Sequence, residues 1–290
     1  MRFGIVVRAF AGLAAMFFVW VGPAMAEDVD LSRPLPDGGA ANAASGDIRS
    51  ARYVGPTRRY AHAVLGDAIE AVALEVRLAD GSAQTFTLPQ NEVFEDITPH
   101  IADLDRDGLN EVITIVASQS GGGSLAVFGL IDGTLERWAN SSSIGIPNRW
   151  MNPAGIADFD GDGVLEIAAV RMPHIGGTLE IWQADFQRKA LNLQTSLHGF
   201  SNHAIGSRAL DLSVATDIDG DGVSDLIVPD ASRRALRFVK ITNAGIAQIK
   251  RIELAGQVDG NLVLEQRDGA AVAVVPLASG QRQTIPISAN

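Results

Sequence analysis

Short runs in which apolar and polar residues alternate dominate the chain after its first 46 residues. A period of two places successive side chains on opposite faces of a sheet, so these runs predict strands. Turn sequences such as Asp132-Gly133 separate neighbouring runs, as hairpins require. No run after the first 26 residues has the period of an amphipathic helix. The pattern predicts an all-β chain with strands at 109–117, 125–131, 135–138, 164–170, 178–184, 189–195, 223–228, 235–242, 246–254, 262–266, 270–275 and 281–287.

Three segments repeat one pattern, an acidic loop followed by a β-rich run. They read IADLDRDGLNEVITIV, IADFDGDGVLEIAAV and ATDIDGDGVSDLIVP, and their first aspartates are 55 and 59 residues apart. A repeat of this length accommodates four short strands, which is the size of one β-propeller blade. Two weaker copies flank them: His62 takes the place of the first aspartate in YAHAVLGDAIEAVALEV, and Leu264 does so in LVLEQRDGAAVAVV. We therefore expect a single β-propeller domain, residues 47–290, built from five repeats of four-stranded blades.

The last repeat has room for only three strands before the chain ends. The alternating stretch Ile48–Val54 precedes the first weak copy and is available as a fourth strand. Pairing of this kind joins the two ends of the chain and removes an exposed sheet edge. The sequence thus predicts a five-bladed ring in which the N-terminal strand completes the last blade.

Each of the three clear repeats carries the spacing D-x-D-x-D-G-x-x-[DE]. Four carboxylates within nine residues repel one another unless a cation neutralises them, and Ca²⁺ takes six to eight oxygen ligands. The glycine permits a backbone reversal, the seventh residue offers its backbone carbonyl, and the ninth offers its carboxylate. We predict about three Ca²⁺ sites, with the ligands Asp103, Asp105, Asp107, Leu109 and Glu111; Asp158, Asp160, Asp162, Val164 and Glu166; and Asp217, Asp219, Asp221, Val223 and Asp225.

These loops have two other interpretations. An EF-hand needs a glutamate at position twelve, where this chain has Thr114, Ala169 and Val228, so that interpretation fails. The second alternative is that the loops are solvated acidic turns without a metal. Three copies in register, with strands on both sides, favour calcium.

The motifs IADLDRDG, IADFDGDG and ATDIDGDG resemble FG-GAP/VCBS-type repeats, which also form the calcium-binding propellers of integrin α-subunits. The resemblance covers roughly residues 61–275. It implies a β-propeller with calcium bound between the first and second strands of a blade, on the twelve carboxylates of the three loops.

The first 26 residues have the order of a secretory signal peptide. Arg2 and Arg8 precede an apolar run, and Ala24-Met25-Ala26 precedes Glu27. The apolar run is short for a membrane span, although an uncleaved anchor is the alternative. Residues 27–46 are rich in Pro, Gly, Ala and Ser and predict a flexible linker. We expect a secreted or periplasmic protein without a membrane span after cleavage.

The net charge of −11 comes from the acidic loops. Without the leader, 21 bases face 34 acids, a net charge of −13, and the three loops hold twelve of those acids. Three bound Ca²⁺ ions would bring this charge to −7. The chain lacks the basic face that nucleic-acid binding requires. It also lacks cysteine, which excludes a thiol enzyme and a disulfide scaffold.

Because successive strands are antiparallel, the remaining long loops lie on the rim opposite the acidic loops. Long loops with Trp, Arg and His on a rigid scaffold suit ligand binding. The alternative is that Trp150 fills space between blades and that the arginines are ordinary surface charges. The candidates for this ligand face are Arg149, Trp150, His174, His203, Arg208, Arg233 and Arg234.

The sequence contains no nucleophile elbow, H-E-x-x-H motif or phosphate loop. This favours a non-catalytic, exported calcium-binding propeller that recognises an extracellular or periplasmic protein or glycan. The alternative is a polysaccharide lyase or hydrolase on a propeller scaffold, because propellers support both classes of function.

Overall fold

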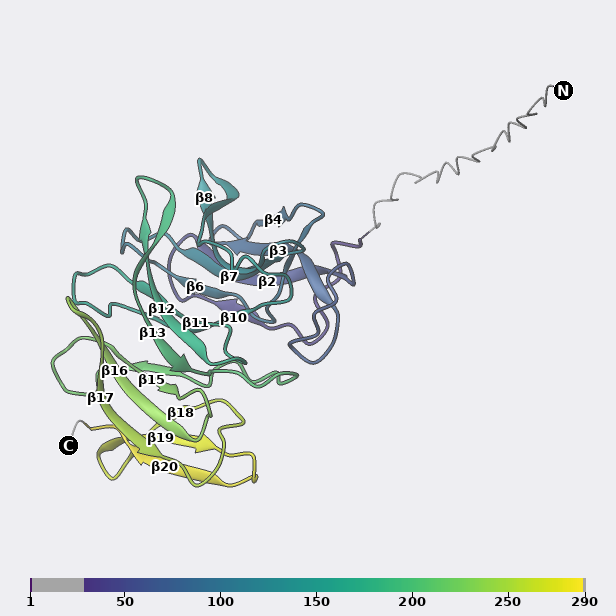
Figure 1. The fold of residues 1–290 in the computed structure, drawn as a ribbon. Coiled ribbons are helices and arrows are strands. Elements are labelled where there is room, and N and C mark those ends of the chain that lie inside the picture. Colours follow the sequence, from purple (N-terminus) through teal and green to yellow (C-terminus); the bar gives the residue numbers. More distant parts are fainter. Residues whose placement is uncertain (2–28, 289–290) are drawn as a thin grey trace.

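The computed structural model describes residue 1 and residues 29–288, and within this range the chain forms twenty β-strands and no helix (Figure 1). Apart from Met1, the expected signal peptide lies outside the described residues. The all-β prediction is confirmed for the described part of the chain. No helix in that part is long and apolar enough to cross a membrane.

The strands form five successive antiparallel units, four with four strands and a last one with three. An extra strand, β5 (Glu92–Phe94), pairs with both β3 and β7 and merges the first two units into one nine-stranded sheet. The units are β1 (Ala40–Asn42), β2 (Ile48–Thr57), β3 (Glu70–Leu78) and β4 (Ala83–Thr87); β6 (His100–Ala102), β7 (Glu111–Ser118), β8 (Gly122–Ile131) and β9 (Thr134–Asn140); β10 (Met151–Ala157), β11 (Glu166–Arg171), β12 (Gly177–Asp185) and β13 (Ala190–Phe200); β14 (Val214–Thr216), β15 (Asp225–Pro229), β16 (Ala235–Thr242) and β17 (Gly245–Glu253); and β18 (Val263–Arg267), β19 (Ala270–Pro276) and β20 (Arg282–Pro286).

The predicted strands of the last four units are present, with shifts of a few residues at their ends. The range 235–242 coincides with β16, whereas 189–195 continues to Phe200 in β13. The extension arises because residues with no apolar pattern still pair across the sheet, as Ser196 does with Glu180. The paired strand therefore extends beyond the residues whose apolar and polar side chains alternate.

Apolar cores lie between neighbouring units. The second strands β7, β11 and β15 are buried almost throughout, because both faces of each strand pack against another sheet. The four main cores include Tyr53, Phe94 and Phe128; Ile113, Trp150 and Trp182; Phe159, Phe200 and Leu226; and Phe238, Val258 and Ile285. Face-to-face packing of successive four-stranded sheets is the arrangement of propeller blades, so the fold is β-propeller-like.

The prediction that the N-terminal strand completes the last unit is wrong. Ile48–Val54 belongs to β2, which pairs with β1 and β3 in the first unit. The fifth unit keeps three strands, and no apolar core among the described residues joins it to the first unit. Figure 1 shows β18–β20 (yellow) at the opposite end of the array from β2–β4. A local hairpin partner for β2 is closer along the chain than the last unit, which explains this pairing.

The frame predicted for the first repeat is also wrong. His62 does not occupy a first-to-second-strand loop, because residues 58–69 connect β2 to β3, the second and third strands of the first unit. The loop equivalent to the acidic loops is 43–47, between β1 and β2. It contains only Asp47 as an acid, so the sequence pattern could not reveal it.

The prediction of a flexible linker fails for residues 29–46. Leu35 is buried, and its N–H donates to the carbonyl of Tyr53 at 3.0 Å. β1 pairs with β2 through Ala40, Ala41 and Asn42. Small and turn-forming residues here follow the surface of the first unit instead of forming a tether.

Candidate metal centres and the opposite rim

Three acidic loops connect the first and second strands of the second, third and fourth units, as predicted. In each loop the first aspartate accepts the N–H of the glycine at position six, over 2.9, 3.1 and 3.0 Å. The aspartate at position five accepts the N–H of position seven, over 2.8, 2.8 and 2.9 Å. The ninth carboxylate accepts the N–H of position two, over 3.0, 2.7 and 3.0 Å. One backbone geometry therefore recurs three times.

The residue at position two anchors each loop. Leu104, Phe159 and Ile218 are buried in the cores between units. The N–H that each offers to the ninth carboxylate ties the acidic group to a residue held by packing. The position of that carboxylate is therefore set by the blade interior and not by the exposed tip of the loop.

The carboxylates at positions one, three and nine converge in every loop, with ligand oxygens within 4.8 Å of one another. The three groups are Asp103, Asp105 and Glu111; Asp158, Asp160 and Glu166; and Asp217, Asp219 and Asp225. These three clusters could hold metal ions.

The ninth carboxylates show the cost of this arrangement without a cation. Burial raises the pKa of Glu111 to about 8, of Glu166 to about 7 and of Asp225 to about 6, and the neighbouring aspartates add to each rise. Asp103 keeps one buried oxygen, Oδ1, without a hydrogen-bond partner in the described chain. Clustered oxygens of this kind fit a hard cation such as Ca²⁺.

Three predicted carboxylate ligands lie outside the converging groups. Asp107, Asp162 and Asp221 each use Oδ1 to accept the N–H two residues later, which shapes the loop. Asp162 also accepts a bond from Gln183 at 2.9 Å. The metal role of these three residues stays a prediction, as does that of the backbone carbonyls of Leu109, Val164 and Val223.

The third loop differs from the other two because a lysine reaches it. The ammonium nitrogen of Lys240 lies 2.7 Å from Asp219 Oδ2 and 3.4 Å from Asp221 Oδ2. The bond from Lys240 lowers the pKa of Asp219. Part of the negative charge that would attract a cation is already neutralised at this loop.

On the opposite rim, Trp150, His174 and His203 form a hub in which Trp150 and His203 are buried and His174 is half-buried. The Trp150 ring stacks on His174, with centroids 6.0 Å apart and planes 7° apart, and packs edge-on against His203 at 4.7 Å. His174 Nε2 lies 2.8 Å from His203 Nδ1. Trp150 therefore fills space between units, as the alternative to a binding role anticipated, and His203 is too buried to contact a ligand directly.

A second polar group lies beside this hub. His62 Nδ1 is 2.5 Å from Oε1 of Glu95, and the indole N–H of Trp150 donates to the Glu95 carbonyl at 2.7 Å. Glu70 and Glu95 are almost fully buried, and each keeps one carboxylate oxygen without a partner in the described chain. Burial raises the pKa of Glu70 to about 9 and that of Glu95 well above its usual range.

The sequence did not single out these two glutamates. A signal was available: Glu95 lies in the segment VFEDI, and Glu70 begins the apolar run EAVALEV. An acid inside a segment expected to be buried indicates a perturbed ionisable group.

The predicted arginines of this rim have different surroundings. Arg149 is exposed. Arg208 bridges Asp67 at 2.7 Å and Asp37 at 3.1 Å. Arg233 donates to the carbonyl of His203 at 2.6 Å, and Arg234 is exposed. Arg208 and Arg233 therefore hold the rim loops together, whereas Arg149 and Arg234 are accessible.

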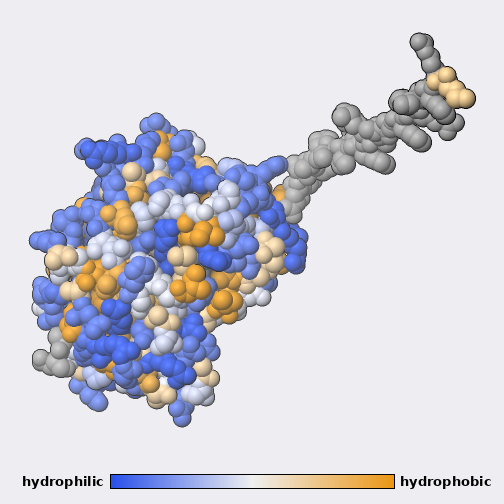
Figure 2. Space-filling model, in the orientation of Figure 1, coloured by the Kyte–Doolittle hydropathy of each residue, from blue (hydrophilic) through white to orange (hydrophobic). Residues whose placement is uncertain are grey.

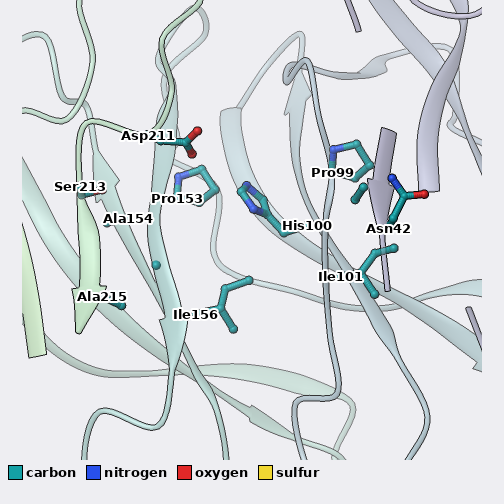
Figure 3. A pocket seen from close by; sticks show the side chains of 12 residues that line it. Asn42, Pro99, His100, Ile101, Pro153, Ala154, Ile156, Asp211, Ser213 and Ala215 are labelled. Carbon is teal, nitrogen blue, oxygen red and sulfur yellow. The ribbon is translucent and has the colours of Figure 1, made fainter. Parts of the chain in front are cut away.

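A cavity of about 450 Å³ lies between the first strands of four units (Figure 3). β1, β6 and β10 line it, together with Asp211, Ser213 and Ala215 from the start of the fourth unit. In the view of Figure 3, His100 lies between Asp211 and Asn42. A second cavity of about 310 Å³ shares His100 and Asp211 and adds Arg208 and Asn261. The sequence did not identify this cavity, because its lining comes from strands distant in the chain.

Residues 103–169 match the model of the FG-GAP-like repeat, which confirms the resemblance expected from the sequence. The match includes the first two acidic loops. No curated protein matches the chain. A solved structure of similar fold is titled "Crystal structure of exotype rhamnogalacturonan lyase YesX", with a TM-score of 0.48 and 15% identity. The similarity covers 87% of this chain and 58% of that lyase chain, so this chain spans less than two thirds of the lyase.

Proposed function

We propose that this chain is an exported, calcium-binding, β-propeller-like recognition module without catalytic activity. Calcium in the three acidic loops stabilises the units, and the opposite rim binds an extracellular or periplasmic protein or glycan. The observation that carries the calcium assignment is the threefold recurrence of one loop geometry around converging carboxylates. The FG-GAP-like repeat at residues 103–169 supports it.

Features of the opposite rim favour a protein partner over a glycan. Ile146, Ile175 and Ile205 are 51%, 62% and 73% exposed, and each belongs to a loop that contributes a residue to the Trp150 hub. The aromatic rings of Tyr60 and Trp150 are buried, so they offer no flat face to a sugar ring. Figure 2 shows apolar residues on one face of the molecule as separate groups among hydrophilic ones. Exposed branched apolar side chains beside an arginine suit a protein interface.

Calorimetric titration with Ca²⁺ tests the metal assignment. We expect binding of about three ions, weaker binding of Mg²⁺, and loss of binding when Asp103, Asp158 and Asp217 are all replaced by Asn. A protein that takes up no Ca²⁺ and keeps its melting temperature in its presence would contradict the proposal.

A polysaccharide lyase or hydrolase is the second candidate, favoured by one observation. His62 is partly exposed and hydrogen-bonded to buried Glu95, a pairing that can orient an imidazole for proton transfer. Incubation with polygalacturonate, followed by absorbance of unsaturated products, separates the two functions. We expect no product, and turnover that disappears in His62→Ala would favour the enzyme.

A further inference from the structure

We infer that His62, Glu95 and Arg149 form a binding site for a carboxylate or similar oxyanion, in which Glu95 holds a proton that moves to the imidazole when the anion binds. The site lies on the rim opposite the acidic loops. It goes beyond the proposed function and does not depend on calcium.

The orientation of His62 is the first observation. Its Nδ1 contacts Glu95 Oε1 at 2.5 Å, and its side chain is 17% exposed whereas that of Glu95 is fully buried. The ring therefore directs Nδ1 towards the interior. Nε2, on the other side of the ring, is the nitrogen available to a ligand.

The second oxygen of Glu95 is the next observation. Oε2 is buried and has no hydrogen-bond partner among the described residues. An ionised carboxylate with a bare oxygen in the interior is costly, whereas a neutral carboxylic acid is less so. Burial raises the pKa of Glu95 and lowers that of His62, in agreement with a neutral pair. Glu95 then donates from Oε1 to Nδ1, and His62 carries its own proton on Nε2.

Arg149 supplies the positive charge. Its guanidinium is exposed and donates from Nη1 to the Asn148 carbonyl at 2.8 Å, and its positive charge adds to burial in lowering the pKa of His62. The residues on both sides of it are held beside the pair, because the Asn148 N–H donates to the Tyr60 hydroxyl at 3.2 Å and the Trp150 indole N–H donates to the Glu95 carbonyl at 2.7 Å. An arginine and an imidazole N–H on a fixed backbone are strong donors to an oxyanion.

The other titratable groups around this pair leave the charge of Arg149 in place at neutral pH. Tyr60 has a raised pKa, Glu70 a pKa of about 9 and His174 a pKa of about 3, each chiefly because of burial, so all three are neutral. Asp96 has a pKa of about 6, so it is ionised at neutral pH, and its charge is compensated by bonds from the Ile97 N–H and the Tyr53 hydroxyl. The site therefore favours an anion over a cation.

The proton step is balanced within the pair. When a carboxylate accepts bonds from Nε2–H and from Arg149, its negative charge stabilises imidazolium. The Oε1–H bond of Glu95 breaks, an Nδ1–H bond forms on His62, and Glu95 becomes ionised. No proton is exchanged with solvent.

Titration of the full chain with acetate tests this inference, with acetamide as the neutral control of the same shape. Nitrogen NMR of the histidine rings should show His62 protonated on Nε2 before acetate is added and on both nitrogens at saturation. Calorimetry in Tris and in imidazole buffer should give the same binding enthalpy, because no net proton is taken up. A His62 that starts with its proton on Nδ1, or one that acetate leaves unchanged, would overturn the inference.

Variants separate the three roles. Glu95→Gln keeps a donor to Nδ1 but has no mobile proton, so His62 should stay neutral and acetate should bind about tenfold more weakly. Arg149→Ala should weaken binding at least about tenfold, whereas Arg234→Ala on the same rim should not. His62→Gln, which retains a polar partner for Glu95, should abolish binding without unfolding the chain. Acetate that protonates both nitrogens of His62 in Glu95→Gln as it does in the wild type would refute the proton transfer from Glu95, whatever the outcome of the calcium titration.

Discussion

At the scale of single residues, each acidic loop depends on three kinds of position. A glycine at position six takes a left-handed backbone, with φ of 92°, 95° and 88° in Gly108, Gly163 and Gly222. An apolar residue at position two anchors the loop, and a buried carboxylate at position nine binds its N–H. These positions hold the carboxylates together against their mutual repulsion.

Gly163→Ala tests the backbone requirement. No atom lies within 4 Å of the position that a Cβ would take, so the substitution creates no clash. The left-handed conformation alone should lower the free energy of unfolding by about 1–3 kcal/mol. In Gly256→Ala the new Cβ makes ordinary contacts with Leu277 at 3.6 Å, and we expect a change within about 0.5 kcal/mol. Urea denaturation measures both, and equal stability of the two variants would contradict the prediction.

Lys240→Gln should strengthen cation binding at the third loop. Lys240 now pairs with Asp219 and Asp221, and a bound Ca²⁺ has to displace or tolerate its charge. We expect the Ca²⁺ affinity of that site to rise, as measured by calorimetry. Arg188→Gln, which removes an exposed pair with Asp185, is the control and should leave the affinity unchanged. Weaker binding in Lys240→Gln would mean that the lysine supports the site.

Glu70→Gln should remove part of the pH dependence of stability. Glu70 has an ordinary pKa of 4.5 and a folded pKa of about 9, mainly because of burial. Between these values the unfolded chain releases a proton that the folded chain retains, so stability falls as pH rises through this window. The variant should therefore be more stable than the wild type at about pH 8 and nearly equal to it at about pH 4. A Glu70→Gln variant that changed the free energy of unfolding equally at both pH values would contradict the prediction.

At the scale of strands and loops, the connections on the two rims have different tasks. The first-to-second-strand connections carry the acidic loops, whereas the other rim gathers residues from several units around Trp150. Arg208 and Arg233 link loops of the same rim through Asp67 and the His203 carbonyl. One rim carries the acidic clusters, and the other carries the packing between units.

Removal of residues 29–46 should destabilise the first unit. The segment contributes β1 and buried Leu35, and without it the edge of β2 is exposed. A chain that starts at residue 47 should have a free energy of unfolding at least about 2 kcal/mol lower than one that starts at residue 29, as measured by urea denaturation. It should also aggregate more readily. Identical denaturation curves are the result that a flexible linker would give.

At the scale of the whole molecule, stability is distributed over cores between successive units, and three of the units carry an acidic loop. Charge is correspondingly local, because residues outside the leader and the three loops are almost electrically balanced. Cations in the loops would act on several cores at once, since each loop is anchored in the core of its unit.

Calcium should therefore stabilise the entire fold. With a dissociation constant of about 0.1 mM and about 1 mM Ca²⁺, each site contributes about 1.4 kcal/mol, or about 4 kcal/mol for three. Urea denaturation in Ca²⁺ and in a chelator measures this difference, with Mg²⁺ as the control. A shift of the same size in the triple Asp103→Asn, Asp158→Asn, Asp217→Asn variant would place the effect outside the loops.

The all-β class, most strands and the three acidic clusters were predictable because they depend on patterns within about ten residues. The first unit was misplaced because its loop at 43–47 lacks the aspartates that mark the others. Trp150 and His203 were correctly located on the opposite rim, but their burial depends on rings from other units. The exposure of Arg149 and the burial of Glu95 also depend on residues from other parts of the chain.

Sequence alone determined the repeating strand pattern and the loop chemistry, because alternation and the D-x-D-x-D-G spacing are local properties of the backbone. Tertiary structure alone decided the partner of Ile48–Val54, the packing of residues 29–46 and the pairing of His62 with Glu95. Those outcomes depend on which strand edges and loops meet in space, and on how much water packing removes from each charged group. Neither the contacts between distant segments nor the burial of a charged group can be derived from a single segment of the chain.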